Sequence, residues 1–464
     1  MAMSLGEEFW TIDPATGTKL ASYTMTETHA CLRLAEEADA AFASWRTTPV
    51  SDRAELVRSL AGVLRKDRER LARTMSHEMG KPIKQSEAEV DKCAWMAEVM
   101  AKEGPGWLAD EEVATDAESS LVRFDPLGVI FGVEPWNFPA WQALRFAVPT
   151  VMAGNSVLVR PSNVVPASSL ILDEDFREAG FPAGVFRVAI TAHATVRDVI
   201  LSPYVKGVSF TGSNGAGSRV AEAAGSRFKK CVLELGGSDP FIVLDDADVP
   251  AAAAAGAESR LINSGQSCIN AKRFVVIESV YEQFRDLFVK EMQSYIVGDP
   301  LDPMTDVGPL ARESQLRQLE SQVRDAVRKG VKVTCGGKRM GGSGYFFEPT
   351  VLENFSIKMK VLHEEVFGPV APLIRVKDDA EAAEWANATR YGLGASIWSR
   401  DADRAASLAG KVAAGVVFVN GLVKSDPRMP FGGVKDSGYG REMSRFGIRE
   451  FTNVKGLNLC TGTA

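Results

Sequence analysis

Residues 128–133, GVIFGV, open a strand–turn–helix–strand pattern that decides the fold. The run is almost wholly apolar, and a turn rich in proline and aromatic residues at 135–139 separates it from a helical pattern over 141–152. A second apolar run follows at 156–160. Strands that are apolar on both faces and alternate with helices are typical of a parallel sheet covered by helices on both sides. The stretch therefore predicts an α/β fold.

The same alternation continues to about residue 420 and indicates two α/β domains, with a boundary near Gly236-Gly237. The first hundred residues are mainly helical in pattern, and two of the helical runs are expected near 51–77 and 83–102. The acidic segment 109–124 lacks a clear period and is expected to form a hairpin, a loop or an arm reaching a neighbour. Further strands are expected near 184–190, 207–210, 231–235, 241–244, 273–278, 331–335, 372–376, 395–398 and 416–420.

The composition bounds the function before any motif is considered. The 464 residues carry a formal net charge of −7 with scattered Lys and Arg, so we expect no basic face for nucleic acid. No apolar run reaches the roughly 18 residues that a membrane helix requires, and the first residues lack the pattern of a signal peptide. The six cysteines and four histidines are dispersed, which favours reduced thiols in a cytoplasm and no metal site.

The stretch NSGQSC, residues 263–268, contains a candidate nucleophile. Gly265 tolerates dihedral angles that other residues resist, and a turn of this kind leaves the thiol of Cys268 accessible beside a free backbone N–H. That N–H could receive an oxyanion formed at an attacked carbonyl. The alternative is that Cys268 is a small buried apolar residue, as most cysteines in soluble proteins are.

Two further side chains are candidates for the same chemistry. Glu234 stands in the apolar run LELGG, where burial would raise its carboxyl pKa and suit it as a general base. Asn137 stands in PWNFP, where a strand ends and a helix begins, and its amide N–H could meet an oxyanion. The alternatives are a partly exposed glutamate at a strand end and an asparagine that caps a helix.

Three other motifs are compatible with a nucleotide. The run FTGSNGAG at 210–217 ends a strand and opens a helix, where free N–H groups and the helix dipole suit a phosphate. Arg160 in VRPSN follows another strand and could meet ribose or phosphate, although an exposed arginine beside a turn is the alternative. The pair Glu364-Glu365 precedes Phe367, and a surface charge cluster is the default interpretation of such a pair.

Taken together and in their order along the chain, these motifs resemble those of the aldehyde dehydrogenase superfamily over nearly the whole chain. A further motif, PFGGVKDSG at 430–438, belongs to the same resemblance. The run KCVLELGGSDP at 230–240 and the general course of the chain look like bacterial succinate-semialdehyde dehydrogenases of the shorter, Sad-like type.

The resemblance implies a Rossmann-like NAD(P) domain, an α/β catalytic domain and a small bridging arm used in a homodimer or homotetramer. The NAD(P) domain would comprise residues 1–108 and 130–234, and the catalytic domain residues 235–445. Residues 109–129 and 446–464 would form the oligomerisation arm.

The resemblance also implies roles for individual residues. Cys268 would be the nucleophile, Glu234 the general base, and Asn137 with the Cys268 backbone N–H the oxyanion hole. The residues expected to contact NAD or NADP are Trp136, Asn137, Arg160, Pro161, Ser162, Asn163, Gly212, Ser213, Leu235, Glu365 and Phe367.

The sequence departs from the family pattern around the adenosine. Arg160 replaces the usual Lys, which keeps the charge and changes its geometry. Asn163 stands where many NAD-preferring members have a Glu, so repulsion against a 2′-phosphate is absent and NADP is admissible beside NAD. Phe146 stands where many members have a Lys near the nucleophile, so a proton relay through that Lys is not expected.

For the substrate, Arg145 falls where several succinate-semialdehyde dehydrogenases have an arginine that binds the carboxylate. A second such arginine corresponds to Ile262, and Ser425 and Arg428 are candidate replacements for it. The expected reaction is NAD(P)-dependent oxidation of an aldehyde, with succinate semialdehyde as the preferred substrate. The alternatives are another aldehyde, a CoA-acylating reaction, a Cys-Glu amidase or thioesterase, and a binding protein without activity.

Overall fold

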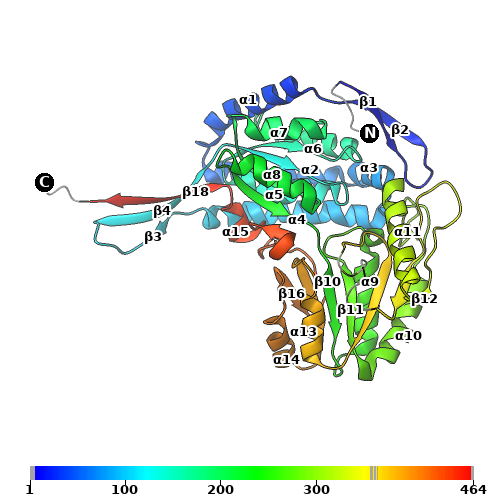
Figure 1. Cartoon of the computed structure of the whole chain (residues 1–464). Coiled ribbons are helices and arrows are strands. Elements are labelled where there is room, and N and C mark those ends of the chain that lie inside the picture. The colour runs from blue at the N-terminus through cyan, green and yellow to red at the C-terminus, as the bar shows by residue number, and fades with distance from the viewer. Residues whose placement is uncertain (1–5, 356–358, 360–361, 363, 461–464) are drawn as a thin grey trace.

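The computed structural model describes residues 6–355, 359, 362 and 364–460 (Figure 1). Two large sheets, each with helices against it, form the body of the molecule, and a narrow three-stranded sheet extends from it. The α/β fold predicted from the sequence is confirmed. No helix in the described part of the chain is long and apolar enough to cross a membrane.

The first sheet has five parallel strands and one short antiparallel strand at its edge. Their order, β17-β9-β8-β5-β6-β7, is that of a doubly wound sheet in which the order of successive strands reverses between β5 and β8. The strands are β5 (Val129–Val133), β6 (Ser156–Arg160), β7 (Phe186–Val188), β8 (Val205–Thr211), β9 (Lys230–Glu234) and β17 (Gly438–Tyr439). The helices between them are α5 (Pro139–Met152), α6 (Pro166–Glu178), α7 (His193–Leu201) and α8 (Asn214–Gly225).

Alternate side chains of these strands lie in two different cores. Ile130 of β5 packs in one apolar cluster, whereas its neighbours Val129 and Phe131 pack in another on the opposite face. Because side chains alternate along a strand, a sheet covered on both faces needs apolar residues at every position. This requirement explains the continuous apolar runs from which the fold was predicted.

Residues before β5 form a hairpin and four helices that pack beside this sheet (Figure 1). The single helical run expected near 51–77 is divided in two at Asp67, whose backbone leaves the helical region while its carboxylate binds Arg70. The elements are β1 (Glu8–Ile12), β2 (Lys19–Thr24), α1 (Thr28–Trp45), α2 (Val50–Lys66), α3 (Arg68–Met79) and α4 (Ile83–Trp107).

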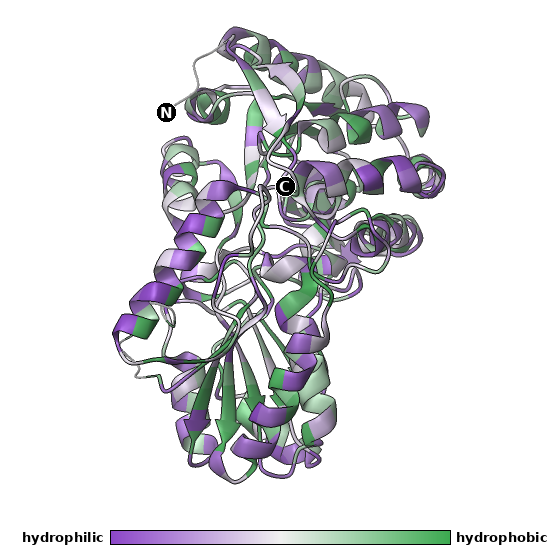
Figure 2. Ribbon diagram, turned by 90° about the vertical axis from the view of Figure 1, so that its right-hand side faces the viewer, coloured by the Kyte–Doolittle hydropathy of each residue, from purple (hydrophilic) through white to green (hydrophobic). Residues whose placement is uncertain are grey.

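The second sheet has the order β12-β13-β14-β11-β10-β15-β16, with only β12 antiparallel to its neighbour among the described pairs. Figure 2 shows hydrophobic strands in this sheet and hydrophilic outer faces on the helices around it. The strands are β10 (Asp239–Val243), β11 (Ala271–Ile277), β12 (Lys332–Cys335), β13 (Thr350–Glu353), β14 (Val370–Val376), β15 (Gly394–Trp398) and β16 (Val416–Val419). The helices are α9 (Val249–Leu261), α10 (Glu278–Ser294), α11 (Glu313–Arg328), α13 (Asp379–Asn387) and α14 (Ala402–Ala409).

The narrow sheet joins two segments that are far apart in the sequence. Strand β4 (Ser119–Pro126) pairs with β3 (Glu111–Glu112) on one side and with β18 (Thr452–Leu459) on the other. The hairpin alternative for the acidic segment is therefore what the structure contains, extended by the last described strand. Helix α15 (Ser444–Ile448) connects β18 to the body. The domain boundaries given above stay a prediction.

Candidate active site

The segment before Cys268 is a left-handed turn, which side chains other than glycine rarely adopt. Asn263, Ser264 and Gly265 have φ values of 52°, 56° and 77°. Such residues cost about 1–3 kcal/mol each unless their surroundings hold them. Here the Asn263 backbone N–H donates to Gln85 Oε1 at 2.7 Å, and a Cβ on residue 265 would lie 2.2 Å from the carbonyl oxygen of Gly368. Only glycine fits at position 265.

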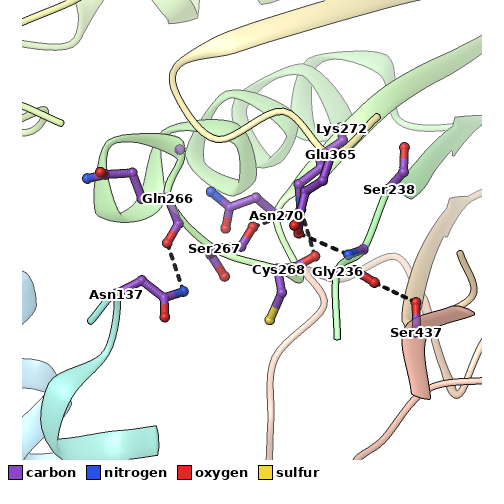
Figure 3. Close-up of polar contacts among 12 residues, drawn as sticks. Asn137, Gly236, Ser238, Gln266, Ser267, Cys268, Asn270, Lys272, Glu365 and Ser437 are labelled. Atoms are coloured by element: carbon purple, nitrogen blue, oxygen red, sulfur yellow. Dashed lines mark hydrogen bonds and ion pairs between the residues drawn. The ribbon is translucent and has the colours of Figure 1, made fainter. Parts of the chain in front are cut away.

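The carbonyl groups beside the thiol are held from the opposite side by Lys272 of β11. Its Nζ donates to the Ser267 oxygen at 2.8 Å and to the Cys268 oxygen at 2.6 Å (Figure 3). A Cβ on Gly237 would lie 2.4 Å from the Cys268 oxygen, so this residue must also be glycine. These contacts fix the backbone of Cys268 and leave its thiol directed toward a cavity.

Asn137 lies across from the thiol, and both residues line the same cavity (Figure 3). Its Nδ2 donates to the Gln266 oxygen at 3.1 Å, and its own backbone oxygen accepts from Asn263 Nδ2 at 2.6 Å. Asn137 does not cap helix α5, because Glu89 accepts the first amides of that helix. The capping alternative is therefore wrong, and the amide is available beside the thiol.

Glu234 ends strand β9 in an apolar setting and is only 2% exposed. Neither of its carboxylate oxygens has a hydrogen-bond partner among the described residues. Burial, and then the nearby charge of Glu442, raise the pKa of Glu234 well above its usual range, although Arg145 opposes the shift. The exposed strand-end alternative is wrong, and this carboxyl group is able to take up a proton near neutral pH.

The electrostatic surroundings keep the Cys268 thiol protonated at rest. Burial, with smaller contributions from the carboxylates of Glu365 and Glu234, raises the pKa of this thiol to about 12. The positive charges of Lys272 and Arg145 act in the opposite direction. Formation of the thiolate therefore requires a base that accepts the proton at the moment of attack.

A cavity of about 440 Å³ runs from the thiol to the amino end of helix α8. It lies beside the ends of β5 and β8, where the strand order reverses and where open α/β sheets bind ligands. Ser213 occupies the N-cap position of α8 without a side-chain cap, so backbone N–H groups stay available there. The cavity is lined by eight of the predicted residues, namely Trp136, Asn137, Gly212, Ser213, Leu235, Cys268, Glu365 and Phe367.

Glu365 and Phe367 face this cavity, so the surface-cluster interpretation is wrong for them. Glu365 Oε1 accepts the Gly237 N–H at 2.9 Å and lies 3.8 Å from Lys272 Nζ. The Phe367 ring meets the edge of the Trp136 ring at a centroid distance of 6.1 Å. Contacts with Gly237 and Trp136 therefore hold Glu365 and Phe367 in the wall of the cavity.

The remaining cofactor candidates lie at the end of the next strand, β6, and directly after it, beside a second cavity of about 490 Å³ that Asn163 lines. Arg160 is buried rather than exposed, and it donates to the Thr191 oxygen and to Asn163 Oδ1. Pro161 follows it, and Ser162 Oγ accepts a hydrogen bond of 3.1 Å from Arg312. Arg312 precedes helix α11 and was not anticipated as part of this region.

Comparison with known proteins identifies the family of the chain that forms this site. The model of the aldehyde dehydrogenase family matches residues 2–457. The chain belongs to this family. The predicted enzyme class, an NAD(P)-dependent aldehyde dehydrogenase, is confirmed.

Relatives of this aldehyde dehydrogenase include curated proteins and solved structures. It is 42% identical over 96% of its length to a succinate-semialdehyde dehydrogenase [NADP(+)] of Deinococcus radiodurans, of which it covers 94%. A protein of the same name from Mycobacterium tuberculosis is 43% identical, with 96% and 98% of the two chains covered. The crystal structure of succinic semialdehyde dehydrogenase from Streptococcus pyogenes with NADP+ superposes with a TM-score of 0.95 at 34% identity, over 98% of this chain and all of that one.

The three residues predicted to hold the substrate of this aldehyde dehydrogenase have different surroundings. Arg145 is buried and forms an ion pair with Glu442, while its guanidinium lies over the Phe431 ring. Arg428 lies in an exposed loop and pairs with Asp426. Ser425 is buried in the same loop, and its hydroxyl accepts a hydrogen bond of 2.7 Å from Lys92. Each of the three is therefore paired with a different residue.

Several residues that shape the site were not identified from the sequence. Lys272 had a visible signal, since a lysine inside the otherwise buried run AKRFVVI must have a specific partner. Glu442 is also a buried charge, but its partner Arg145 lies far away in the sequence. Glu89 is buried beside Lys81, eight residues before it, and also accepts the amides of Ala140 and Trp141. Lys92 lies in an amphipathic helical pattern, where a lysine looks like an ordinary surface residue.

Replacement of Glu234 separates its two effects on the thiol. In Glu234→Gln the negative charge is lost, so the pKa of Cys268 falls and alkylation by iodoacetamide proceeds at lower pH than in the wild type. Turnover of aldehyde falls by at least about 10²-fold, because the proton acceptor is lost. The pH dependence of alkylation and the steady-state rate measure the two effects.

The alkylation is best followed in a Cys460→Ser background, because Cys460 is exposed while the four other non-catalytic cysteines are buried. Cys268→Ala serves as the blank. An alkylation midpoint that stays unchanged or moves to higher pH would contradict the assigned charge interaction.

Proposed function

We propose that this enzyme oxidises succinate semialdehyde to succinate through a thioester on Cys268, with NADP or NAD as the hydride acceptor. The observation that carries the proposal is the shared cavity that joins Cys268 and Asn137 to the amino end of α8. The relatives support the substrate, since the similar proteins of D. radiodurans and M. tuberculosis are named succinate-semialdehyde dehydrogenases.

In the first step the Cys268 sulfur bonds to the aldehyde carbon, and the thiol proton passes to Glu234. The former carbonyl oxygen becomes an oxyanion that accepts hydrogen bonds from the Asn137 amide and from the Cys268 backbone N–H. A donor of this kind stabilises the transition state by on the order of 3 kcal/mol. Lys272 contributes indirectly, because it holds the two carbonyl groups that orient the Cys268 backbone.

In the second step the carbon–hydrogen bond of the adduct breaks and leaves a thioester on Cys268. The nicotinamide ring of a bound cofactor would supply the hydride acceptor. Glu234 first releases the thiol proton to solvent and so becomes a base again. It then removes a proton from water, the water oxygen bonds to the thioester carbon, and the Cys268 sulfur leaves and takes up that proton. The buried carboxyl group with its raised pKa favours hydrolysis over transfer to CoA, because hydrolysis needs such a base.

The residues around the second cavity fit a nucleotide that carries a 2′-phosphate. Asn163 offers no negative charge there, and the Ser162 hydroxyl and the Arg312 guanidinium are hydrogen-bonded to each other beside it. An arginine fork can bind a phosphate through two parallel hydrogen bonds. The relatives named as NADP(+) enzymes give further support for this preference.

The narrow sheet supports a proposal about assembly. Its edge strand β18 carries exposed apolar side chains, with Val454 61% and Leu459 53% exposed. An exposed strand edge is a template for pairing with another chain. We therefore keep residues 109–129 and 446–464 as the oligomerisation arm of a homodimer or homotetramer, and a cytoplasmic location stays a prediction.

The substrate is tested by initial rates with succinate semialdehyde, glutarate semialdehyde and butanal, each with NADP and with NAD. We expect the highest kcat/KM with succinate semialdehyde and NADP, and a loss of at least about 10²-fold in Cys268→Ala and Glu234→Gln. A wild-type enzyme that prefers butanal would contradict the proposed substrate. Undiminished rates in both variants would contradict the mechanism.

Arg312→Ala tests the proposed 2′-phosphate contact. We expect KM for NADP to rise about 10-fold or more, since a charge-assisted contact is lost, while KM for NAD changes little. Arg317→Ala is the matched control, because Arg317 lies on the adjoining helix α11 and pairs with Glu313 on the surface. Equal changes for NADP and NAD in Arg312→Ala would show that Arg312 has no role in discriminating between them.

A further inference from the structure

Arg145 is poorly suited to bind a substrate carboxylate because its charge is already compensated. Its partner Glu442 is 4% exposed, and the carboxyl groups of Glu234 and Glu134 also act on its guanidinium. Three buried carboxyl groups therefore surround this one arginine. A substrate carboxylate would add a fourth, at the cost of leaving Glu442 without its cation.

The charge of Lys92, by contrast, is not compensated by an ion pair with any described residue. This lysine lies on helix α4, partly buried, with its Nζ 2.7 Å from Ser425 Oγ and 4.2 Å from the centre of the Trp141 ring. Within the part of the chain that the structure describes, no carboxylate lies within ion-pair distance of this ammonium group. The acid of the neighbouring loop, Asp426, is paired with Arg428.

Helix α5 links Lys92 of α4 to the cavity of the thiol. Trp141, whose ring lies under Lys92, precedes Gln142, and Gln142 lines the cavity together with Cys268 and Asn137. Cys268 packs against the same apolar cluster that contains Trp141 and Phe431. Arg145 lies one turn farther along α5 than Trp141, and its charge acts on both Cys268 and Lys92. Lys92 therefore lies beside the region of Arg145, toward which the distal end of an aldehyde on Cys268 would extend.

Ser425 completes the arrangement at Lys92. Its hydroxyl oxygen accepts from the ammonium group, so its own hydrogen stays available to donate to an anion. A carboxylate bridging Lys92 and Ser425 would receive two hydrogen bonds, one of them charge-assisted. The Trp141 ring shields this position from water on one side.

We propose that Lys92, assisted by Ser425, binds the distal carboxylate of the substrate and makes this enzyme selective for a semialdehyde acid. The inference rests on the proposed function and names the residue that would produce its specificity. Arg145 then has a positioning role, holding Glu442 beside Glu234.

The charge state of Lys92 gives the selectivity a pH dependence. Burial lowers the pKa of Lys92 to about 8, and Cys93 and Glu89 on its own helix, Arg145 on α5 and Asp426 in the loop modify it. The ammonium form is present below that pH and is lost above it. Selectivity for a carboxylate over a neutral aldehyde should therefore decline as the pH rises through about 8.

The test compares succinate semialdehyde with butanal, which has the same chain length and no carboxylate. In Lys92→Met, kcat/KM for succinate semialdehyde falls about 10- to 100-fold, mainly through KM, while the value for butanal stays within about twofold. Lys92→Arg retains most of the preference. Lys102→Met is the matched control, because Lys102 lies on the same helix and is exposed.

The ratio of the two kcat/KM values removes the titration of Cys268 and Glu234, which both substrates share. We expect this ratio to fall above pH about 8 in the wild type and to be flat in Lys92→Met. A preference that survives in Lys92→Met overturns the inference, as does an equal loss for both substrates, which indicates a structural role. A wild-type preference for butanal is a separate result that overturns the proposed function itself.

Discussion

The hydrogen bond from Asn263 Nδ2 to the backbone oxygen of Asn137 is the contact on which the site depends. It joins the left-handed turn before Cys268, which leads into the second sheet, to the end of β5 in the first. Without it a strained turn and a helix terminus would each be free to relax. The positions of the thiol and of the oxyanion donor are therefore not independent, and one contact between distant segments sets both.

The second constraint is the amount of charge buried behind the thiol. Glu234, Glu442 and Glu134 are all buried, and Arg145 is the cation that acts on all three. Placing carboxyl groups together in a desolvated region is unfavourable and holds a proton on some of them near neutral pH. A base that must take a proton from a thiol and then from water benefits from this environment.

The fold could be predicted well from the sequence because it depends on local patterns of apolar residues. The apolar runs of β5, β6, β8 and β9 required two covered faces, and the clusters on either side of the sheet confirm this reading. Strand β13 and helix α14 were missed, since Thr350–Glu353 is only four residues long and Ala402–Ala409 spans little more than two turns. Short elements depend on their neighbours more than on their own pattern.

A residue of the candidate site could be predicted where its neighbours in the sequence are unusual for its residue type. Glu234 in an apolar strand, Cys268 after a glycine turn and Asn137 between a strand and a helix were all visible in this way, and the resemblance gave each a definite role. The partners of Arg145, Lys92 and Arg312 were not, because Glu442, Ser425 and Ser162 lie roughly 150 to 330 residues away from them. Such pairings depend on the tertiary structure, and no periodic pattern in the sequence predicts them.

The central claim, that the acid is released from a thioester on Cys268 by water that Glu234 activates, is tested most directly by trapping that thioester. Glu234→Gln is mixed with NADP and succinate semialdehyde, quenched in acid, digested and analysed by mass spectrometry. We predict that one NADPH forms per active site, slowly because Glu234 no longer takes the thiol proton, and that a succinyl group then stays on the peptide that contains Cys268. Continued NADPH formation with no acyl group on that peptide would contradict it.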